Sequence, residues 1–158
     1  MLPLPRSPYA ASKLAAEAYF RAFTVSMGVP TVSLRYFNVY GPGQNPASGY
    51  AAVVPRFAIA CITRRCPVVH GDGEQPRDFT YIDDVGKANL LAARAAEDAH
   101  GRTFNIGGGE APISVNEVLR IVSELTGVAP DPVFEPPREG DVRRTEADVR
   151  ATLEPGGD

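Results

Sequence analysis

The clearest pattern of apolar and polar positions lies in residues 114–127, where apolar side chains recur every three or four residues. The members of this stripe are Val115, Val118, Leu119 and Val122. Residues at that spacing share one face of a helix, so the stripe predicts an amphipathic helix. Ser114 and Glu117 form a Ser-x-x-Glu capping box at its start, and Gly127 is typical of its end.

A second and longer helix is predicted over residues 9–27, which are rich in alanine, leucine, glutamate and phenylalanine. Ser7 can cap its first turn, and Pro8 suits the first helical position. Gly28 ends the run, as glycine commonly does after the last helical residue.

Short runs of β-branched and aromatic residues, bounded by glycine and proline, predict the strands. These runs are Thr31–Phe37, Pro67–His70, Phe79–Ile82 and Thr103–Ile106. Shorter helical patterns lie between them at 54–65 and at 83–95, where Asp83 and Asp84 can cap the first turn. Alternating strands and helices favour an α/β class with helices on a mainly parallel sheet. From Pro130 onward the chain is rich in proline, glycine and charge, and its last residues are expected to form an exposed tail.

The composition is that of one ordinary globular domain, with 158 residues, 44% of them hydrophobic, and a formal charge of -3. This balance gives no general positive field for nucleic acid or an anionic membrane, so neither is an expected partner. Lys13 and Lys87 are the only lysines, and arginine, which suits bidentate phosphate recognition, supplies the other cations. Cys61 and Cys66 lack metal-site spacing, and we see no leader or membrane-spanning run, so we expect a soluble cytoplasmic protein without a metal.

Tyr9 and Lys13 are the pair that most suggests redox chemistry. Their four-residue spacing is just over one helical turn, so both side chains leave the same face of the predicted helix. An isolated phenol ionises near pH 10, and a fixed positive charge beside it favours the phenolate that a base requires. The alternative for an arbitrary Tyr-x-x-x-Lys is a tyrosine that covers the core beside a solvated lysine.

Four motifs follow one another along the chain. They are Ser7-Pro8-Tyr9-x-x-x-Lys13, Leu34-Arg35-Tyr36-Phe37-Asn38-Val39-Tyr40-Gly41-Pro42, Gly71-Asp72-Gly73 with Arg77-Asp78-Phe79, and Arg138-x-Gly140-Asp141. In this order they resemble the extended short-chain dehydrogenase/reductase family, and within it the NAD-dependent nucleotide-sugar epimerases and dehydratases. The loop at residues 44–55 is most similar to that of the 4-epimerases that act on UDP-hexoses.

The resemblance implies a partial Rossmann-like parallel sheet with flanking helices, joined to the small C-terminal substrate-binding domain of this family. Residues 1–41 would form the C-terminal part of the dinucleotide-binding domain, including the helix with the Tyr-x-x-x-Lys motif. Residues 42–158 would mainly bind the nucleotide-sugar, interleaved with late Rossmann elements around 78–106.

Two parts of the family pattern have no counterpart in this sequence. Family members begin with a strand and a G-x-x-G-x-x-G turn for the cofactor pyrophosphate, and they carry a catalytic serine or threonine well upstream of the tyrosine. The chain therefore resembles the C-terminal half of such an enzyme, and we expect it to be inactive in isolation. The expected partners are NAD, a nucleotide-sugar, and either a second copy in a homodimer or a complementing N-terminal half.

The resemblance also implies roles for the residues nearest the chemistry. Tyr9, as phenolate, would remove the proton of the sugar 4-hydroxyl during transient hydride transfer to NAD. Lys13 would stabilise the phenolate and hold the ribose hydroxyls of the cofactor. Phe37 would touch the nicotinamide side of the cofactor, although an aromatic residue in a strand is usually part of the core.

Five further residues are implied as contacts to the nucleotide-sugar. They are Asn38, Gly71, Arg77, Arg138 and Asp141. Asn38 ends a strand, where open α/β sheets receive ligands, but an asparagine there is about as often bonded to its own turn. Both arginines can form forks to phosphate oxygens, although an exposed arginine is most often only a solvated charge. Asp141 resembles the carboxylate that binds the nucleotide ribose, and Gly71 a turn beside the uridine pocket.

The function that these patterns favour is NAD-dependent epimerisation at C4 of a UDP-hexose. Two alternatives stay open at this point. One is a nucleotide-sugar dehydratase or decarboxylase, whose extra acid/base residues would lie near the upstream serine or threonine. The other is a non-catalytic remnant or a sugar-nucleotide binding domain that does not hold NAD.

Overall fold

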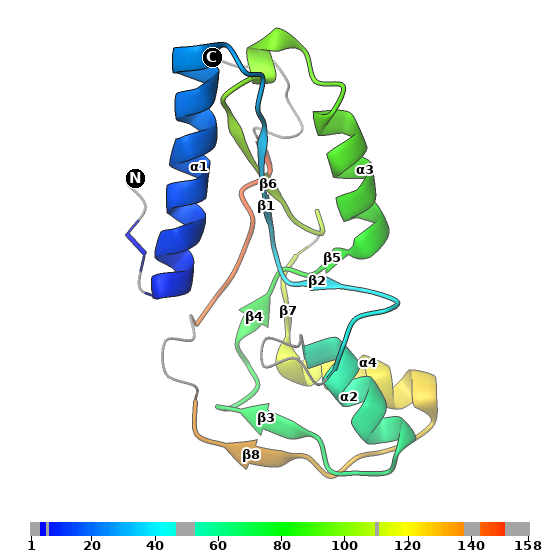
Figure 1. Ribbon diagram of the computed structural model, residues 1–158. Helices are drawn as coiled ribbons and strands as arrows, with labels where there is room; N and C mark the ends of the chain where they lie inside the picture. Colours follow the sequence, from blue (N-terminus) through cyan, green and yellow to red (C-terminus); the bar gives the residue numbers. More distant parts are fainter. Residues whose placement is uncertain (1–3, 6, 47–52, 110, 138–142, 151–158) are drawn as a thin grey trace. The chain divides into compact units, whose positions relative to one another are not determined.

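The computed structural model describes residues 4–5, 7–46, 53–109, 111–137 and 143–150, and Figure 1 shows its elements. The chain divides into two compact units. The first draws on Met1–Tyr36, Asp83–Ile106 and Asp148–Asp158, and the second on Phe37–Ile82 and Gly107–Ala147. Within the described ranges, no helix combines the length and the apolar character needed to cross a membrane.

The first unit has one pair of parallel strands with a helix on each side (Figure 1). Its elements are α1 (Pro8–Met27), β1 (Ser33–Tyr36), nearly all of α3 (Ile82–Ala92), the 3-10 turn η1 (Glu97–Ala99) and β6 (Thr103–Ile106). Strands β1 and β6 are in register from Ser33 opposite Thr103 onward. Polar contacts tie both helices to β1, because Arg35 pairs with Glu17 of α1 and the Tyr36 hydroxyl donates to Asn89 of α3.

The second unit consists of short strand ladders and two helices. Its elements are β2 (Val39–Tyr40), α2 (Val53–Ile62), β3 (Val68–His70), β4 (Pro76–Arg77), β5 (Thr80–Tyr81), β7 (Ile113–Ser114), α4 (Val115–Thr126) and β8 (Val133–Glu135). Strand β2 pairs with β5 and β3 with β8, both in parallel, whereas β4 and β7 are antiparallel. Helices α2 and α4 pack against each other (Figure 1).

The hydrophobic core lies in the second unit, where α2, β3 and α4 meet. Its buried members are Phe57, Cys61, Val69, Val115, Val118, Leu119 and Val122. The four residues from α4 are the stripe that the sequence predicts, so the helical periodicity correctly identifies the buried face. In the first unit, by contrast, Ile106 is the single buried side chain among the described residues.

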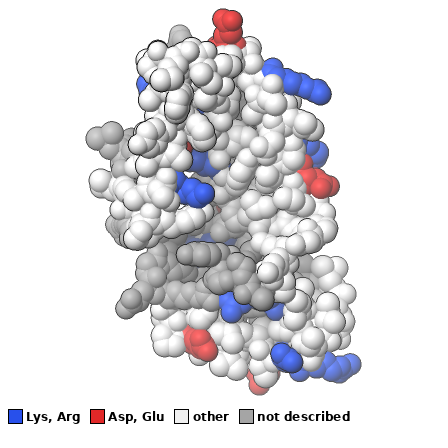
Figure 2. Space-filling model, in the orientation of Figure 1, with Lys and Arg blue, Asp and Glu red and all other residues white. Residues whose placement is uncertain are grey.

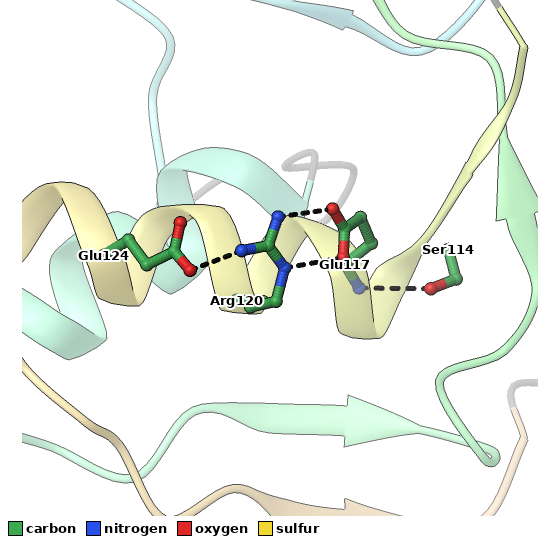
Figure 3. Close-up of polar contacts among 4 residues, drawn as sticks. All are labelled: Ser114, Glu117, Arg120 and Glu124. Carbon is green, nitrogen blue, oxygen red and sulfur yellow. Dashed lines mark hydrogen bonds and ion pairs between the residues drawn. The ribbon is translucent and has the colours of Figure 1, made fainter.

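Helix α4 has the Ser114 cap and the Gly127 stop that its sequence predicts, and Figure 3 shows the cap. The second half of the predicted capping box is absent among the described hydrogen bonds, because the Glu117 carboxylate accepts from Arg120. The Ser114 hydroxyl oxygen accepts a hydrogen bond of 3.1 Å from the Glu117 backbone N–H, and Gly127 ends the helix at φ 66°. On the exposed face, Arg120 donates to the carboxylates of Glu117 and Glu124. The hydrogen bonds from Arg120 hold the pKa of Glu117 below its ordinary value.

On the face drawn in Figure 2, acidic and basic side chains are scattered among uncharged ones. Several charged residues of the described chain pair with near neighbours in the sequence. Lys87 Nζ lies 2.9 Å from Asp84 Oδ1 within α3, and Arg144 Nη2 lies 2.8 Å from Glu146 Oε2. Such exposed local pairs contribute little to stability.

The observed elements confirm the α/β class and most of the predicted helices and strands. Two local features differ from the expectations. Residues 133–135, for which the sequence predicts no strand, form the exposed strand β8, whose hydrogen-bond partners belong to the distant strand β3. Asp83 and Asp84 lie inside the first turn of α3 and not before it, and this helix ends at Ala92.

Candidate active site

The position of Tyr9 is set by the way α1 begins. Ser7 has an extended backbone and its hydroxyl oxygen accepts a 3.1 Å hydrogen bond from the Ala10 N–H, while Pro8 takes the first helical position. Both residues play the capping roles that the sequence predicts. Tyr9 therefore stands in the first turn of the helix, with Lys13 one turn further along.

Tyr9 and Lys13 lie together on one face of α1. The Lys13 ammonium nitrogen is 5.3 Å from the centroid of the Tyr9 ring, a distance at which a cation is attracted to the ring face. Tyr9 is 60% exposed, so its ring is not packed into hydrocarbon. The predicted same-face arrangement is thus present, and the alternative of a core tyrosine does not apply.

A groove of about 630 Å³ runs along α1 and β1 in the first unit and includes both residues in its wall. The apolar part of the wall includes Leu4, Pro5, Leu14, Phe20, Val32, Leu34 and Tyr36. This volume lies in the range of sites for small molecules and cofactors. An apolar groove with a phenol and an ammonium on one side can bind a flat, partly apolar molecule and act on its hydroxyl groups.

The Glu17–Arg35 ion pair lies in the wall of the same groove. Arg35 donates through Nε and Nη2 to the two carboxylate oxygens of Glu17, at 2.8 and 2.5 Å. These hydrogen bonds raise the pKa of Arg35 above its ordinary value. The bidentate pair fixes α1 against β1, and so it supports the helix face that carries Tyr9 and Lys13.

The second unit contains the predicted substrate residues that the structure describes. Gly71 follows β3 in the left-handed region, at φ 75°, where glycine is favoured, and its N–H donates to the Glu135 carbonyl at 2.8 Å. Asp72 Oδ1 accepts from the Glu74 N–H at 3.0 Å, which closes the predicted turn. Gly71 is thus held between a strand end and a tight turn.

Asn38 and Phe37 come directly after β1 in the chain. Asn38 has φ 35°, and its Nδ2 group donates to the Asp78 carbonyl at 2.6 Å and to the Thr145 hydroxyl oxygen at 3.0 Å. Phe37 is half-buried, and its carbonyl accepts from the Thr80 hydroxyl at 2.7 Å. Asn38 therefore bonds to distant segments of its unit, which differs from the local turn bond considered above.

Arg77 is buried, with 8% of its surface exposed. Its Nη1 group donates to the carbonyls of Pro76 and Arg143 at 3.1 and 3.3 Å. The guanidinium is therefore part of a fixed structure and is not a solvated surface charge. Arg138 and Asp141, the other two predicted substrate contacts, lie outside the described residues.

Asp78 is a residue to which the sequence analysis assigns no role. It is 4% exposed, and its two carboxylate oxygens accept from the backbone N–H groups of Gly108 and Ala147, at 2.7 and 2.9 Å. A signal was available in the sequence, because Asp78 sits inside the Arg-Asp-Phe motif beside the predicted ligand Arg77. The structure thus brings Asn38, Arg77 and Asp78 together in the second unit and pairs Tyr9 with Lys13 in the first.

A family model described as the NAD dependent epimerase/dehydratase family matches residues 2–107. A putative UDP-glucose 4-epimerase from Methanocaldococcus jannaschii is 38% identical over 92% of this chain and 46% of the relative. The chain therefore spans about half the length of the curated relatives that it matches.

Solved structures give the same picture. A UDP-glucose 4-epimerase from Thermotoga maritima, crystallised with UDP-glucose, has a TM-score of 0.89 and 40% identity over 96% of this chain and 48% of its own. The Thermus thermophilus UDP-glucose 4-epimerase in complex with NAD has a TM-score of 0.85 and 39% identity over the same shares. Both likenesses extend over nearly all of the present chain.

Proposed function

We propose that this chain, which belongs to the NAD dependent epimerase/dehydratase family, supplies the Tyr–Lys pair and part of the sugar pocket of a UDP-hexose 4-epimerase. The observation that carries the proposal is the placement of Tyr9 and Lys13 on one helix face, 5.3 Å from ring to ammonium, in the wall of an open groove. The similarity to UDP-glucose 4-epimerases over most of the chain supports the choice of substrate class.

NAD is the cofactor that we assign to the first unit. The volume and largely apolar wall of the groove fit part of a dinucleotide, and Lys13 offers three N–H donors that suit ribose hydroxyls. When bound, NAD would supply reversible hydride transfer at C4 of the sugar. By the family resemblance, Phe37 is assigned to the nicotinamide side of the cofactor.

Tyr9 is the proposed base and acid. As phenolate it accepts the proton of the 4-hydroxyl while the C4 hydrogen leaves as hydride, which produces a 4-keto sugar. After the sugar has turned over, Tyr9 returns the proton to the same oxygen, so C4 is inverted without net oxidation. By the family resemblance, Lys13 is assigned to place its positive charge beside the reacting phenol, and its ammonium lies 5.3 Å from the Tyr9 ring centroid.

The nucleotide-sugar contacts are proposed on the second unit. Arg77 and Arg138 would balance the charge of the diphosphate, Asp141 would bind the nucleotide ribose, and Gly71 would line the uridine pocket. Asn38 has two N–H donors on its amide, and both are used within the protein. We therefore assign its free acceptor, the Oδ1 atom, to a hydroxyl group of the sugar.

The proposed division of labour matches the two units in part, because residues 37–41 and 78–82 belong to the second unit. Residues 1–41 and late Rossmann elements around 78–106 would belong to the dinucleotide-binding part, and the rest mainly to the nucleotide-sugar part. The first unit draws on Met1–Tyr36 and Asp83–Ile106, which supports this assignment. A second copy of the chain in a homodimer and a complementing N-terminal half are both retained as proposed partners.

Activity measurements test the proposal directly. The chain alone, incubated with NAD and UDP-galactose, is expected to give no UDP-glucose. Mixed with the separately expressed N-terminal half of the Thermotoga maritima relative, it is expected to give measurable UDP-glucose. Tyr9→Phe should lower that rate by about 10²–10⁴, the usual contribution of a general acid or base.

The matched control is Tyr19→Phe, which removes a hydroxyl from another exposed tyrosine of α1 and should leave the rate unchanged. Equal rates for Tyr9→Phe and Tyr19→Phe would exclude Tyr9 as the base. Titration of the chain alone with UDP tests the nucleotide part of the proposal separately. UDP binding by the chain together with no epimerisation in the mixture would leave a sugar-nucleotide binding domain.

A further inference from the structure

Asp78 is the centre of a hydrogen-bonded junction that joins four segments of the second unit. Its carboxylate accepts from the N–H groups of Gly108 and Ala147, and its own N–H donates to the Thr145 carbonyl at 3.1 Å. Its carbonyl accepts from the Asn38 amide. Residues 38, 78, 108 and 145–147 are thus fixed to one another, although they lie far apart in the sequence.

The junction is closely packed around the carboxylate. A Cβ atom on Gly107 would lie 2.5 Å from Asp78 Oδ2, and one on Gly108 would overlap the Phe79 carbonyl oxygen. The two glycines therefore allow the backbone to approach a buried charge. Burying a carboxylate is costly unless it is well hydrogen-bonded, so the hydrogen bonds of Asp78 are a structural requirement of this site.

Two of the proposed substrate residues are attached to this junction. The Asn38 amide donates both of its N–H groups to the junction, one to the Asp78 carbonyl and one to the Thr145 hydroxyl oxygen. Arg77 precedes Asp78 in the chain, and its guanidinium donates to the Arg143 carbonyl. The Thr145 N–H also donates to the Pro76 carbonyl at 3.2 Å, so residues 143–147 lie along β4.

We propose that Asp78 is a positioning residue: its Oδ1 atom holds Gly108 and its Oδ2 atom holds Ala147, which keeps residues 143–147 beside β4 and thereby orients Asn38 and Arg77 for a nucleotide diphosphate. The ligand in this statement rests on the function proposed above, whereas the junction itself does not. Asp78 has no part in the proton transfer, because its oxygens are committed to backbone N–H groups.

The test compares Asp78→Ala with Asp78→Asn in the complete chain. An asparagine has the shape of aspartate, but only one of its two groups accepts a hydrogen bond, and its NH₂ group would face a backbone N–H. If the site requires two acceptors, both variants should weaken UDP binding, measured by titration calorimetry, by at least about tenfold. If the side chain acts only by filling space, Asp78→Asn should bind UDP as the unchanged chain does, which would overturn the proposal.

Val122→Ala is the matched control for a general loss of stability. This core residue of α4 is not among the described hydrogen-bond partners of the Asp78 carboxylate. Its truncation leaves a cavity elsewhere in the same unit. It should lower the denaturation midpoint as the Asp78 variants do, yet leave UDP binding within about twofold at a temperature where all variants are folded. A loss of UDP binding in Val122→Ala equal to that in Asp78→Ala would also overturn the proposal.

Hydrogen exchange makes the junction testable apart from the ligand. In Asp78→Ala, peptides that contain residues 107–109 and 143–147 should exchange at least about tenfold faster than in the unaltered chain. Exchange in α4 should be the same in both chains. Unchanged exchange at both peptides refutes the junction. If the unaltered chain binds no UDP, the proposed function fails, and the exchange result alone decides whether Asp78 holds the segment.

Discussion

The two units of this chain have equally well-formed helices but very different interiors. Helices α2 and α4 of the second unit bury seven apolar side chains together with β3, whereas α1 of the first unit has 20 residues and no buried side chain among those described. Several large apolar residues of α1 are exposed, including Tyr19, Phe20, Phe23, Val25 and Met27. The contrast shows that capping and helix propensity place a helix, while burial provides most of its stability.

The largest difference should appear in a pair of phenylalanine truncations. Phe57 in α2 is 1% exposed and Phe23 in α1 is 43% exposed. Phe57→Ala should lower the free energy of unfolding by about 3–5 kcal/mol, because it leaves a cavity in a closed core. Phe23→Ala should cost less than about 1 kcal/mol, since its ring is half in solvent. Urea denaturation measures both losses. Equal losses would show that Phe23 belongs to a core of the first unit that is as stabilising as the core of the second.

Amide hydrogen exchange should rank the helices in the same order. We expect α1 and α3 to exchange at least about a hundredfold faster than α4, because local opening is easiest where few apolar contacts must break. A hundredfold difference corresponds to about 2.7 kcal/mol in the free energy of opening. Mass spectrometry of peptides from each helix measures it. If α1 were protected as strongly as α4, the two units would have to unfold as one.

A matched pair of glycines sharpens the comparison further. Gly28 and Gly127 end α1 and α4 with the same left-handed geometry, φ 66° in both, and a Cβ at either would meet no atom within 4 Å. Alanine at either position should cost about 1 kcal/mol locally, because it disfavours positive φ. Gly127→Ala should shift the denaturation of the second unit, and Gly28→Ala only that of the first. If either substitution shifted the denaturation of both units equally, the two units would not have separate stabilities.

The smallest effect concerns the exposed ion pairs of α4. The pKa of Glu117 is lowered by its hydrogen bonds with Arg120, so this pair stabilises the folded state above the ordinary glutamate pKa and is lost as pH falls through the lowered one. Glu117→Gln should therefore reduce stability slightly at pH 7 and have no effect near pH 2. Denaturation curves at the two pH values test this sign, and a larger effect in acid would refute it.

Local sequence signals were sufficient for the parts of the molecule whose contacts are close in the chain. The caps at Ser7 and Ser114 and the stops at Gly28 and Gly127 are formed within one turn, so the residue types alone predict them. The proximity of Tyr9 and Lys13 follows from helix geometry in the same way. The resemblance to a family also came from these short motifs, and the family match supports it.

The sequence by itself determined the α/β class, the limits of α1 and α4 and the placement of Tyr9 and Lys13 on one helix face, because each depends on residues within a turn or a strand of one another. Only the tertiary structure decided that residues 133–135 form β8, that Asn38 uses both amide donors internally, and that Asp78 joins Gly108 to Ala147. These contacts connect segments that are dozens of residues apart. Backbone groups carry no residue-specific signal of which distant partner they will meet, so such bonds follow from the packed fold and not from local composition.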